Sequence, residues 1–437
     1  NKYAIFPSVA FGWKASNESF LIDNPTISNL KLRASYGLTG NQAIGPYESL
    51  AIYRVQPPSE VGGAFGVDLA REENPDLKWE TSYQTNVGVD VGLFEDRVTF
   101  GIDYYNIETR DLLAVDRASS FYLGTSDLDV LRNVGSINNN GVEFSLTSTN
   151  INKNDFRWIT NFNFARNRNE ILELSGGTEI IGSGAPGYFA GGNTYLLREG
   201  EALGLFWGLD YQGVYQGGEL PAGTAVQERS LDEDENPIPG EPLFTDLANE
   251  EGDVDGVIND NDRQIIGDPN PDFTFGFTNT FSYKNFDLNV FFQGAVGGDI
   301  YNLTAVQLYN GDSNGLKDVL NSWTPENTDT DIPRAVASRR ELSSRFVESG
   351  SYVRLKNIAL GYNLSSSFLQ NVGFSSARLS ISAQNLLTFT DYSGLDPEVS
   401  YFGSGGESSG DDNVIQGHDF GNYPNLRSIT FGLNLKF

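Results

Sequence analysis

The sequence predicts an all-β protein, an antiparallel β-barrel that spans a membrane and carries long extracellular loops. Apolar and polar side chains alternate along about thirteen segments, which is typical of strands with two unlike faces. Short turns and long loops alternate between these segments, as they do in outer-membrane barrels. No stretch approaches the roughly 18 consecutive apolar residues that a transmembrane helix needs. Transmembrane strands escape that requirement because every second residue faces away from lipid.

Composition narrows the classes of protein that remain. The 437 residues include 48 Gly, 20 Tyr and 29 Phe but no Cys. The lack of Cys excludes disulfides, thiolate metal sites and thiol nucleophiles. The net charge of -29 argues against a nucleic-acid partner, because phosphate would be repelled. The chain contains no Met and opens on a strand-like pattern, NKYAIFPSVAFGW, without a signal peptide, so we expect a processed or partial chain.

In the first half of the chain, strands are clearest where short turns join them. Val87, Val89, Val91 and Leu93 alternate with polar residues and glycines, and a turn at 95–96 leads into the next alternating segment. So tight a turn predicts an antiparallel hairpin. The strands predicted in this half cover residues 2–13, 29–36, 77–93, 98–105, 142–147 and 158–165, and a second short turn covers 152–155.

In the second half, two weaker strands precede an acidic loop rich in Gly and Pro at 216–270. The cleanest strand follows it, with five aromatic residues on one face and Thr, Ser and Gly on the other. Its phase is regular, whereas a slip near 356–358 predicts a β-bulge. The strands predicted in this half cover residues 194–198, 203–215, 273–283, 286–293, 352–362, 378–386 and 427–437, with short turns at 284–285 and 365–375.

The loop pattern favours a membrane barrel over a soluble sandwich. A sandwich would place turns every 8–12 residues at both ends, whereas here short turns alternate with loops of roughly 30–50 residues. Aromatic residues near strand ends fit interfacial girdles, although ordinary core packing is the alternative; they are Phe11, Trp13, Trp158, Tyr283 and Phe286. About thirteen strands is an odd number, whereas single-chain bacterial barrels have even numbers, so we expect the later part of a larger barrel.

An acidic stretch at 251–262 has the spacing of a twelve-residue calcium loop. Gly256 stands at position six, where the loop bends sharply, and alternate carboxylates could surround a hard cation. The expected calcium ligands are Glu251, Asp253, Asp255, Val257 and Asp262. Glu replaces the usual Asp at position one, Asp replaces Glu at position twelve, and no flanking helices are predicted. Asp246 or Asp260 could supply a ligand instead, and the alternative is an exposed loop whose acids only face solvent.

Signals for catalysis are poor. His418, beside Asp419, is the only histidine, and neither a nucleophile elbow nor an H-E-x-x-H zinc helix is present. We therefore predict no catalytic residues and no organic cofactor, and we expect His418 to be a polar surface residue. Loop aromatics could stack on a substrate or simply pack the loops; they are Tyr122, Tyr188, Phe189, Tyr309, Trp323, Tyr401 and Phe402.

Several stretches resemble one family, the SusC/RagA-like TonB-dependent outer-membrane transporters. They are LKLRASYGLTGNQAIG (30–45), DVDGVINDNDRQIIGDPNPDFTFGFTNTFSYKNFDL (253–288), YVRLKNIALGYNL (352–364), QNLLTFTDYSGLDPEV (384–399) and YPNLRSITFGLNLKF (423–437). The resemblance implies a barrel of 22 strands in the bacterial outer membrane, with residues 1–437 forming its C-terminal portion. The plug domain and the first strands would then be absent from this chain.

The resemblance also implies partners and a function. Members of this family import glycans or peptides with energy from TonB, which acts through the plug, and a SusD-like surface lipoprotein closes over the barrel. The final strand is similar to the signal read by the barrel-assembly machinery, a role that falls to Ile429, Phe431, Leu433, Leu435 and Phe437. The expected partners are thus the lipoprotein, TonB, the missing N-terminal part, an oligosaccharide or peptide substrate and outer-membrane lipid.

Two other functions stay open at this point. A non-transporting outer-membrane or surface protein that binds glycans or acts as an adhesin would show the same alternation. An outer-membrane barrel hydrolase is disfavoured by the missing catalytic motifs. A requirement for detergent separates a membrane barrel from a soluble β protein.

Overall fold

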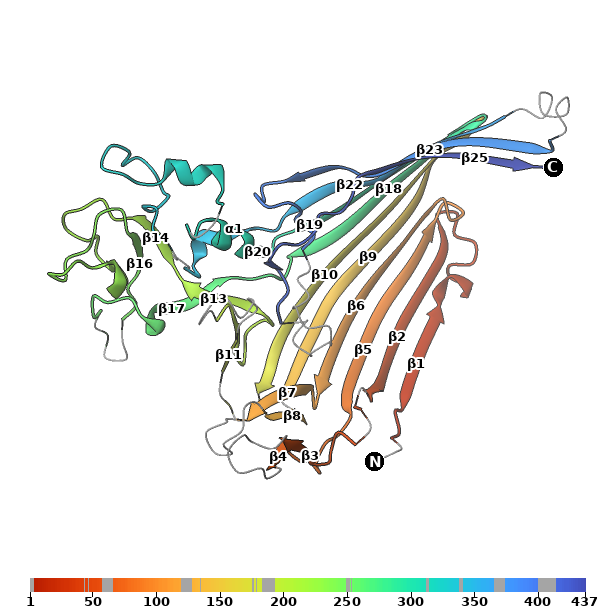
Figure 1. Cartoon of the computed structure of the whole chain (residues 1–437). Helices are drawn as coiled ribbons and strands as arrows, with labels where there is room; N and C mark the ends of the chain where they lie inside the picture. Colours follow the sequence, from red (N-terminus) through yellow and green to blue (C-terminus); the bar gives the residue numbers. More distant parts are fainter. Residues whose placement is uncertain are drawn as a thin grey trace.

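Eleven strands form one antiparallel sheet in a computed structural model of the chain (Figure 1). The structure describes residues 4–42, 44–45, 47–56, 66–118, 128–133, 135–174, 177, 179–182, 193–248, 252, 254–311, 314–337, 341–364, 374–399 and 414–437. In order across the sheet the strands are β1 (Ser8–Lys14), β2 (Ile27–Asn41), β5 (Glu80–Leu93), β6 (Val98–Arg110), β9 (Gly135–Lys153), β10 (Phe156–Leu174), β18 (Phe273–Tyr283), β19 (Phe286–Val296), β22 (Tyr352–Asn363), β23 (Ser376–Thr390) and β25 (Ser428–Lys436).

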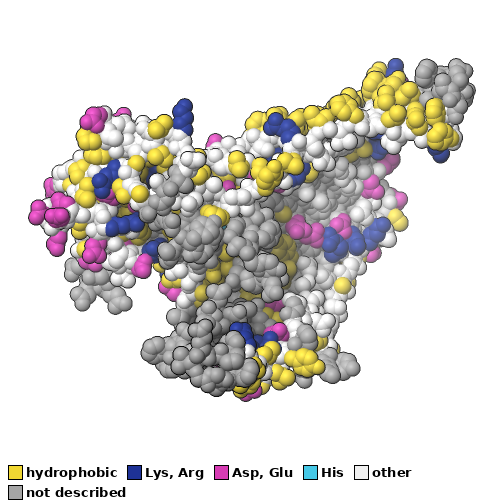
Figure 2. All heavy atoms as spheres, viewed as in Figure 1, with side chains coloured by type: hydrophobic (Ala, Val, Ile, Leu, Met, Phe, Trp, Pro, Cys, Tyr) yellow, Lys and Arg dark blue, Asp and Glu magenta, His cyan; other side chains and the backbone are white. Residues whose placement is uncertain are grey.

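The register of the sheet separates its two faces. Leu32, Val89, Ile102 and Phe144 are direct cross-strand partners on four successive strands, and this face stays exposed, with Ile102 40% and Phe277 37% accessible. Exposed apolar rows that run across a whole sheet are expected where the solvent is lipid. The opposite face carries polar side chains and glycines. Figure 2 shows acidic and basic side chains beside one another in the hollow of the sheet.

The short turns form where the sequence places them. Phe94, Glu95 and Asp96 have φ of 54°, 57° and 59°, and they join β5 to β6. Asn154 and Lys284, at φ 54° and 52°, do the same for the next two hairpins. The predicted bulge is confirmed by a register shift between Leu355 and Asn357 in β22. The turn expected at 365–375 falls mostly outside the described residues.

Two of the thirteen predicted strands lie outside the main sheet. Residues 194–198 and 203–215 do form strands, but in small separate sheets. All five residues of β13 (Leu205–Leu209) are buried, so this strand has no exposed apolar face to offer to lipid. The prediction of about thirteen barrel strands is corrected to eleven in the described part of the chain, because alternation alone does not show which sheet a strand joins.

The remaining elements belong to the connections. The paired and small-sheet strands are β3 (Ile52–Gln56), β4 (Gly66–Arg71), β7 (Leu113–Ala118), β8 (Leu128–Asn133), β11 (Ile180–Gly182), β12 (Tyr195–Leu197), β13 (Leu205–Leu209), β14 (Tyr211–Val214), β15 (Thr224–Ala225), β16 (Pro242–Thr245), β17 (Arg263–Gly267), β20 (Asp299–Asn302), β21 (Val347–Ser349) and β24 (His418–Asp419). The helices are α1 (Leu303–Leu308) and the 3-10 turns Ala15–Asn17, Glu228–Ser230, Asp260–Asp262, Lys317–Asn321 and Ser344–Phe346.

A loop module holds the principal hydrophobic core. It comprises the segments between β10 and β18, between β19 and β22, and between β23 and β25, which gather beside the sheet in Figure 1. Its largest buried cluster contains Phe206, Tyr301, Leu303, Ala305, Val306, Leu342 and Phe346. Among the described residues, no helix has the length and apolar character needed to cross a membrane. The sheet thus supplies a wall, and the module supplies a packed body at one end of it.

Candidate functional site

One continuous polar row crosses eight strands of the sheet. Successive cross-strand partners along it are Lys31, Asp90, Gly101, Ser145, Asn163, Gly276, Gln293 and Arg354. Adjacent strands lie about 4.8 Å apart, so the row presents a polar strip across much of the wall. Two of its eight positions are glycine, so at these two positions no side chain projects from the sheet.

Arg33, on the same face, joins the first part of the row to its neighbours. Its Nε lies 2.8 Å from Asp90 Oδ2 and its Nη1 lies 2.9 Å from Asp103 Oδ1. Gly88 stands between Arg33 and Asp103 in the register. A Cβ at Gly88 would lie 2.2 Å from Asp103 Oδ1, so glycine is what allows the ion pair to span an intervening strand.

A second glycine has the same function further along the sheet. Arg378 Nη2 donates to Asp287 Oδ2 at 2.7 Å from two strands away. A Cβ at Gly361 would lie 2.2 Å from Arg378 Nη2 and 2.7 Å from Asp287 Oδ1. Charged side chains therefore lie flat along the polar face at both places.

A recess of about 380 Å³ opens on this face in the middle of the row. Its polar lining residues are Asp103, Glu143, Ser145, Asn163 and Gln293, together with Gly276 and Thr274. Carboxylates, amides and hydroxyls can accept and donate hydrogen bonds to a polar ligand. Such a set suits reversible contact with hydroxyl or amide groups of a solute. It contains no nucleophile paired with a base.

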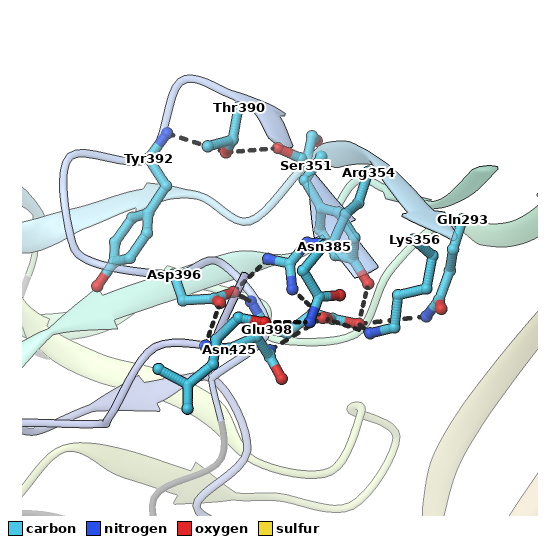
Figure 3. Close-up of polar contacts among 12 residues, drawn as sticks. Gln293, Ser351, Arg354, Lys356, Asn385, Thr390, Tyr392, Asp396, Glu398 and Asn425 are labelled. Atoms are coloured by element: carbon cyan, nitrogen blue, oxygen red, sulfur yellow. Dashed lines mark hydrogen bonds and ion pairs between the residues drawn. The ribbon is translucent and has the colours of Figure 1, made fainter. Parts of the chain in front are cut away.

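The row ends at a buried ion-pair cluster (Figure 3). Arg354, 1% exposed, donates to Asp396 and Glu398 of the segment that follows β23. Lys356 Nζ lies 2.9 Å from Glu398 Oε2, and Tyr352 donates its hydroxyl hydrogen to Glu398 at 3.0 Å. Charge-assisted bonds of this kind are about twice as strong as neutral ones. The loop carboxylates are therefore firmly attached to β22.

The same cluster shows where the loop lies. Gln293, which lines the recess, donates to Glu398 Oε1 at 3.2 Å. Asn425, just before β25, donates its backbone N–H to Asp396 Oδ2 at 2.8 Å. Both ends of the connection between β23 and β25 are thus held on the polar face, beside the recess. Sequence reasoning missed this cluster, although glycines and charges on the polar faces of the strands were a signal for the ion pairs along the wall.

The predicted calcium ligands are not assembled as a ready-made site in the part of the chain that the structure describes. Glu251 and Asp253 lie outside the described residues. Asp255 is exposed and its Oδ1 accepts a hydrogen bond from the Val257 N–H at 2.9 Å. Asp262 is 3% exposed and accepts from the Asn259 N–H at 2.8 Å. No three described His, Asp or Glu side chains converge on a common metal position.

His418 is buried in the structure, although the sequence predicted a surface residue. It is fully buried, with its Nδ1 3.0 Å from the Ile415 carbonyl and its Nε2 3.0 Å from Thr194 Oγ1. A carbonyl can only accept, so Nδ1 carries the hydrogen and the Thr194 hydroxyl donates to Nε2. Burial lowers the pKa of His418 to about 4. The expectation of a polar surface histidine is therefore wrong.

Two of the loop aromatics lie within described residues. Tyr309 packs against Phe346 of the main core cluster, with ring centroids 6.0 Å apart. Trp323 donates its indole N–H to Gln216 Oε1 at 2.8 Å. Both contacts hold the loop module together. The other five, Tyr122, Tyr188, Phe189, Tyr401 and Phe402, lie outside the described residues.

The final strand keeps its expected alternation. It pairs with β23, and the apolar residues of its exposed face are Ile429, Phe431, Leu433 and Leu435. Phe437, 90% exposed, has its ring centroid 5.4 Å from that of Phe374. This exposed apolar ladder continues the apolar face of the sheet, because Phe431 is the partner of Ile381 and Ile381 of Leu360.

Comparisons with known proteins agree with this geometry. The family model described as TonB dependent receptor-like, beta-barrel matches residues 1–386. TonB-dependent receptor P3 of Formosa agariphila is 48% identical, over 100% of this chain and 42% of its own length. TonB-dependent receptor SusC of Bacteroides thetaiotaomicron is 29% identical, over 100% of this chain and 40% of its own. A solved structure of the RagAB peptide transporter matches with a TM-score of 0.78 at 27% identity, over 99% of this chain and 43% of that chain. The chain spans less than half the length of these relatives.

Proposed function

Because the chain belongs to the β-barrel family of SusC/RagA-like TonB-dependent receptors, we propose that its polar face lines the path of a nutrient imported across the bacterial outer membrane. The nutrient is an oligosaccharide or a peptide. TonB supplies the energy through a plug, and a SusD-like surface lipoprotein acts with the barrel. Members of the family are outer-membrane β-barrel proteins, so the apolar face of this sheet lies against outer-membrane lipid.

The observation that carries the proposal is the division of the sheet into two faces. Apolar cross-strand rows cover one face, and the polar row with its recess covers the other. A wall between lipid and an aqueous path needs this division. The recess offers hydrogen-bonding groups without a catalytic arrangement, which suits passage of a polar solute. The similarity to the RagAB peptide transporter supports a peptide, whereas glycan import rests on the resemblance to the family.

Uptake by cells that carry the intact receptor tests the proposal. A bulky Asn163→Trp side chain in the recess should reduce uptake of the nutrient on which the strain depends, while Phe162→Trp on the apolar face of the same strand should not. Deleting TonB should abolish uptake by the unaltered receptor. Nutrient binding at the surface without TonB-dependent uptake would instead support the glycan-binding or adhesin alternative. Equal uptake by both Trp variants would show that the polar row does not line the path of the nutrient.

We also propose that the final strand directs barrel assembly. Its exposed apolar ladder and terminal aromatic, Phe437, would be read during insertion into the membrane. Phe437→Ala should reduce the amount of receptor assembled in the outer membrane, whereas Lys436→Ala, at the neighbouring position on the polar face, should not. Equal amounts of both variants in outer-membrane fractions would contradict this role.

A further inference from the structure

A buried carboxylate in the loop module has an oxygen without a partner. Asp246, immediately after β16, is 7% exposed. Its Oδ2 accepts a hydrogen bond from the Gly256 N–H at 2.9 Å. Its Oδ1 is buried and has no hydrogen-bond partner among the described residues. An unpaired buried carboxylate oxygen is costly, so it points to a group that is bound there.

Two further carboxylates, Asp255 and Asp262, lie in the same turn, a name used here for the described residues between 246 and 262. Asp262 Oδ1 accepts from the N–H of Leu247, the residue after Asp246, at 2.9 Å. Asp255 directly precedes Gly256, which holds the other oxygen of Asp246. The hydrogen bonds to Gly256 and Leu247 therefore bring Asp246 close to both acids. These contacts join residues 246–247 to the acidic stretch that the sequence singles out.

No basic side chain in the described part of the chain offsets the charge of these acids. Among the described residues, none of the three carboxylates forms an ion pair with Lys or Arg, and Arg263 instead binds Asp260, with Nε 2.8 Å from Oδ1. These three carboxylates therefore receive no counter-charge from the part of the chain that the structure describes.

We propose that this turn binds one calcium ion, with Asp246 Oδ1 as its buried ligand and Asp255 and Asp262 as the other carboxylates. Backbone carbonyls and water supply the remaining oxygens. The three carboxylates do not share one metal position in the described structure, and binding of the ion brings the side chains of Asp255 and Asp262 to Asp246 Oδ1. Ca²⁺ accepts six to eight oxygens in irregular geometry, whereas Mg²⁺ requires a near-ideal octahedron, so an irregular set of carboxylates and carbonyls favours Ca²⁺.

The expected affinity is that of extracellular calcium modules, with a Kd of about 0.1–1 mM. The carbonyl of Val257 is a further ligand of the proposed site; it accepts from Asn259 Nδ2 at 3.3 Å. The site concerns the shape of the loop module and is independent of the transported nutrient. Failure of the calcium experiment would therefore leave the proposed import function untouched.

Calcium titration of the intact receptor in detergent tests this site. Calorimetry with CaCl₂ should find one bound ion, and Asp246→Asn, which keeps an oxygen for the Gly256 N–H, should weaken binding at least tenfold. Asp260→Asn is the matched control, because Asp260 lies in the same stretch, its side chain is 91% exposed and it pairs with Arg263. The control should bind like the unaltered receptor. MgCl₂ at the same concentration should not compete.

Several results would overturn the assignment. They are the absence of calcium binding at millimolar concentration, unchanged binding in Asp246→Asn, equal loss in Asp260→Asn, and equal competition by Mg²⁺. If Asp246→Asn does not assemble, Asp255→Asn decides the question, since that side chain is exposed. Asp255→Asn should weaken binding several-fold, and unchanged affinity would exclude the proposed ligand set.

Discussion

Individual glycines determine how charges are arranged on the polar face. Gly88 and Gly361 each stand where an ion pair crosses a strand, and a methyl group at either position would overlap the paired side chains. Gly12 is also a cross-strand partner of Arg33, but a Cβ there would meet only Lys31 Cε, at 3.7 Å. Glycines on the same face therefore differ: there is room for a methyl group at Gly12, but not at Gly88 or Gly361.

Replacing Gly88 should disturb the wall more than replacing Gly12. Gly88→Ala should cost about 1–3 kcal/mol, because Asp103 and Arg33 must move apart. Gly12→Ala should be neutral or stabilising by about 0.4–1 kcal/mol, since it lowers the entropy of the unfolded chain. Unfolding of the two variants in the same detergent measures the difference. Equal stabilities would show that the ion pair relaxes around the methyl group.

Among the charged residues of the described sheet, we expect Arg354 to contribute most to the stability of the fold. Arg354→Met leaves Asp396 and Glu398 without their shared partner in a buried site and should cost about 3–5 kcal/mol. Arg378→Met is the control, because its ion pair with Asp287 is 38% and 32% exposed and should contribute about 1 kcal/mol or less. Hydrogen exchange of residues 391–399 should rise only in Arg354→Met. Unchanged protection would show that other contacts hold the loop.

At the scale of elements, exposure distinguishes strands that look alike in sequence. β18 keeps aromatic residues on one face and small polar residues on the other, whereas β13 is buried throughout. The first therefore becomes wall and the second becomes core. β24, only two residues long, pairs in parallel with β20 and places His418 against Phe206 and Tyr301.

His418 makes this part of the loop module sensitive to acid. Its pKa of about 4 in the folded protein lies below the usual 6.5, so the unfolded state binds the proton first. The stability it contributes is present above about pH 6.5 and is lost as the pH falls toward 4, with a total of roughly 3 kcal/mol. The protection factors of residues 415–421, which compare the exchange rate with the intrinsic rate at the same pH, should therefore fall between pH 7 and pH 4.5.

The chain offers its own control for that measurement. His418 is the only histidine, so a step that disappears in His418→Gln belongs to this side chain. Tyr301, the neighbouring titratable ring, does not ionise in this range, because burial raises its pKa above the ordinary value. An identical pH dependence in His418→Gln would assign the step to carboxylates.

For the whole molecule, the same substitution should cost more stability on the apolar face than on the polar face. Phe144→Arg places a charge on the face toward lipid and should cost about 2–4 kcal/mol near the middle of the bilayer. Ser145→Arg, the next residue, points into the recess beside Asp103 and Glu143 and should cost less than about 0.5 kcal/mol. Folding into lipid vesicles compares the two. A larger loss for Ser145→Arg would reverse the assignment of the faces.

The short turns and the principal strands could be predicted because their causes are local. Val87, Val89 and Val91 alternate within a few residues of sequence, and the turn at Glu95 follows directly. The ion pairs could not be predicted in the same way. Arg354 and Glu398 are 44 positions apart, and their contact depends on how a long connection folds back. All of the calcium ligands stay a prediction, and two of them, Glu251 and Asp253, lie outside the described residues.

The sequence by itself determined the two-faced strands, their order and the class of membrane wall they build, because alternation acts between neighbouring residues. Only the tertiary structure decided that Lys31 and Arg354 belong to one row, that β13 leaves the wall, and that His418 and Asp246 are buried. Each of these depends on the register between distant segments. Alternation excludes a shift of one residue, because such a shift would exchange the two faces, but it permits a shift of two residues, which would pair different side chains in the row.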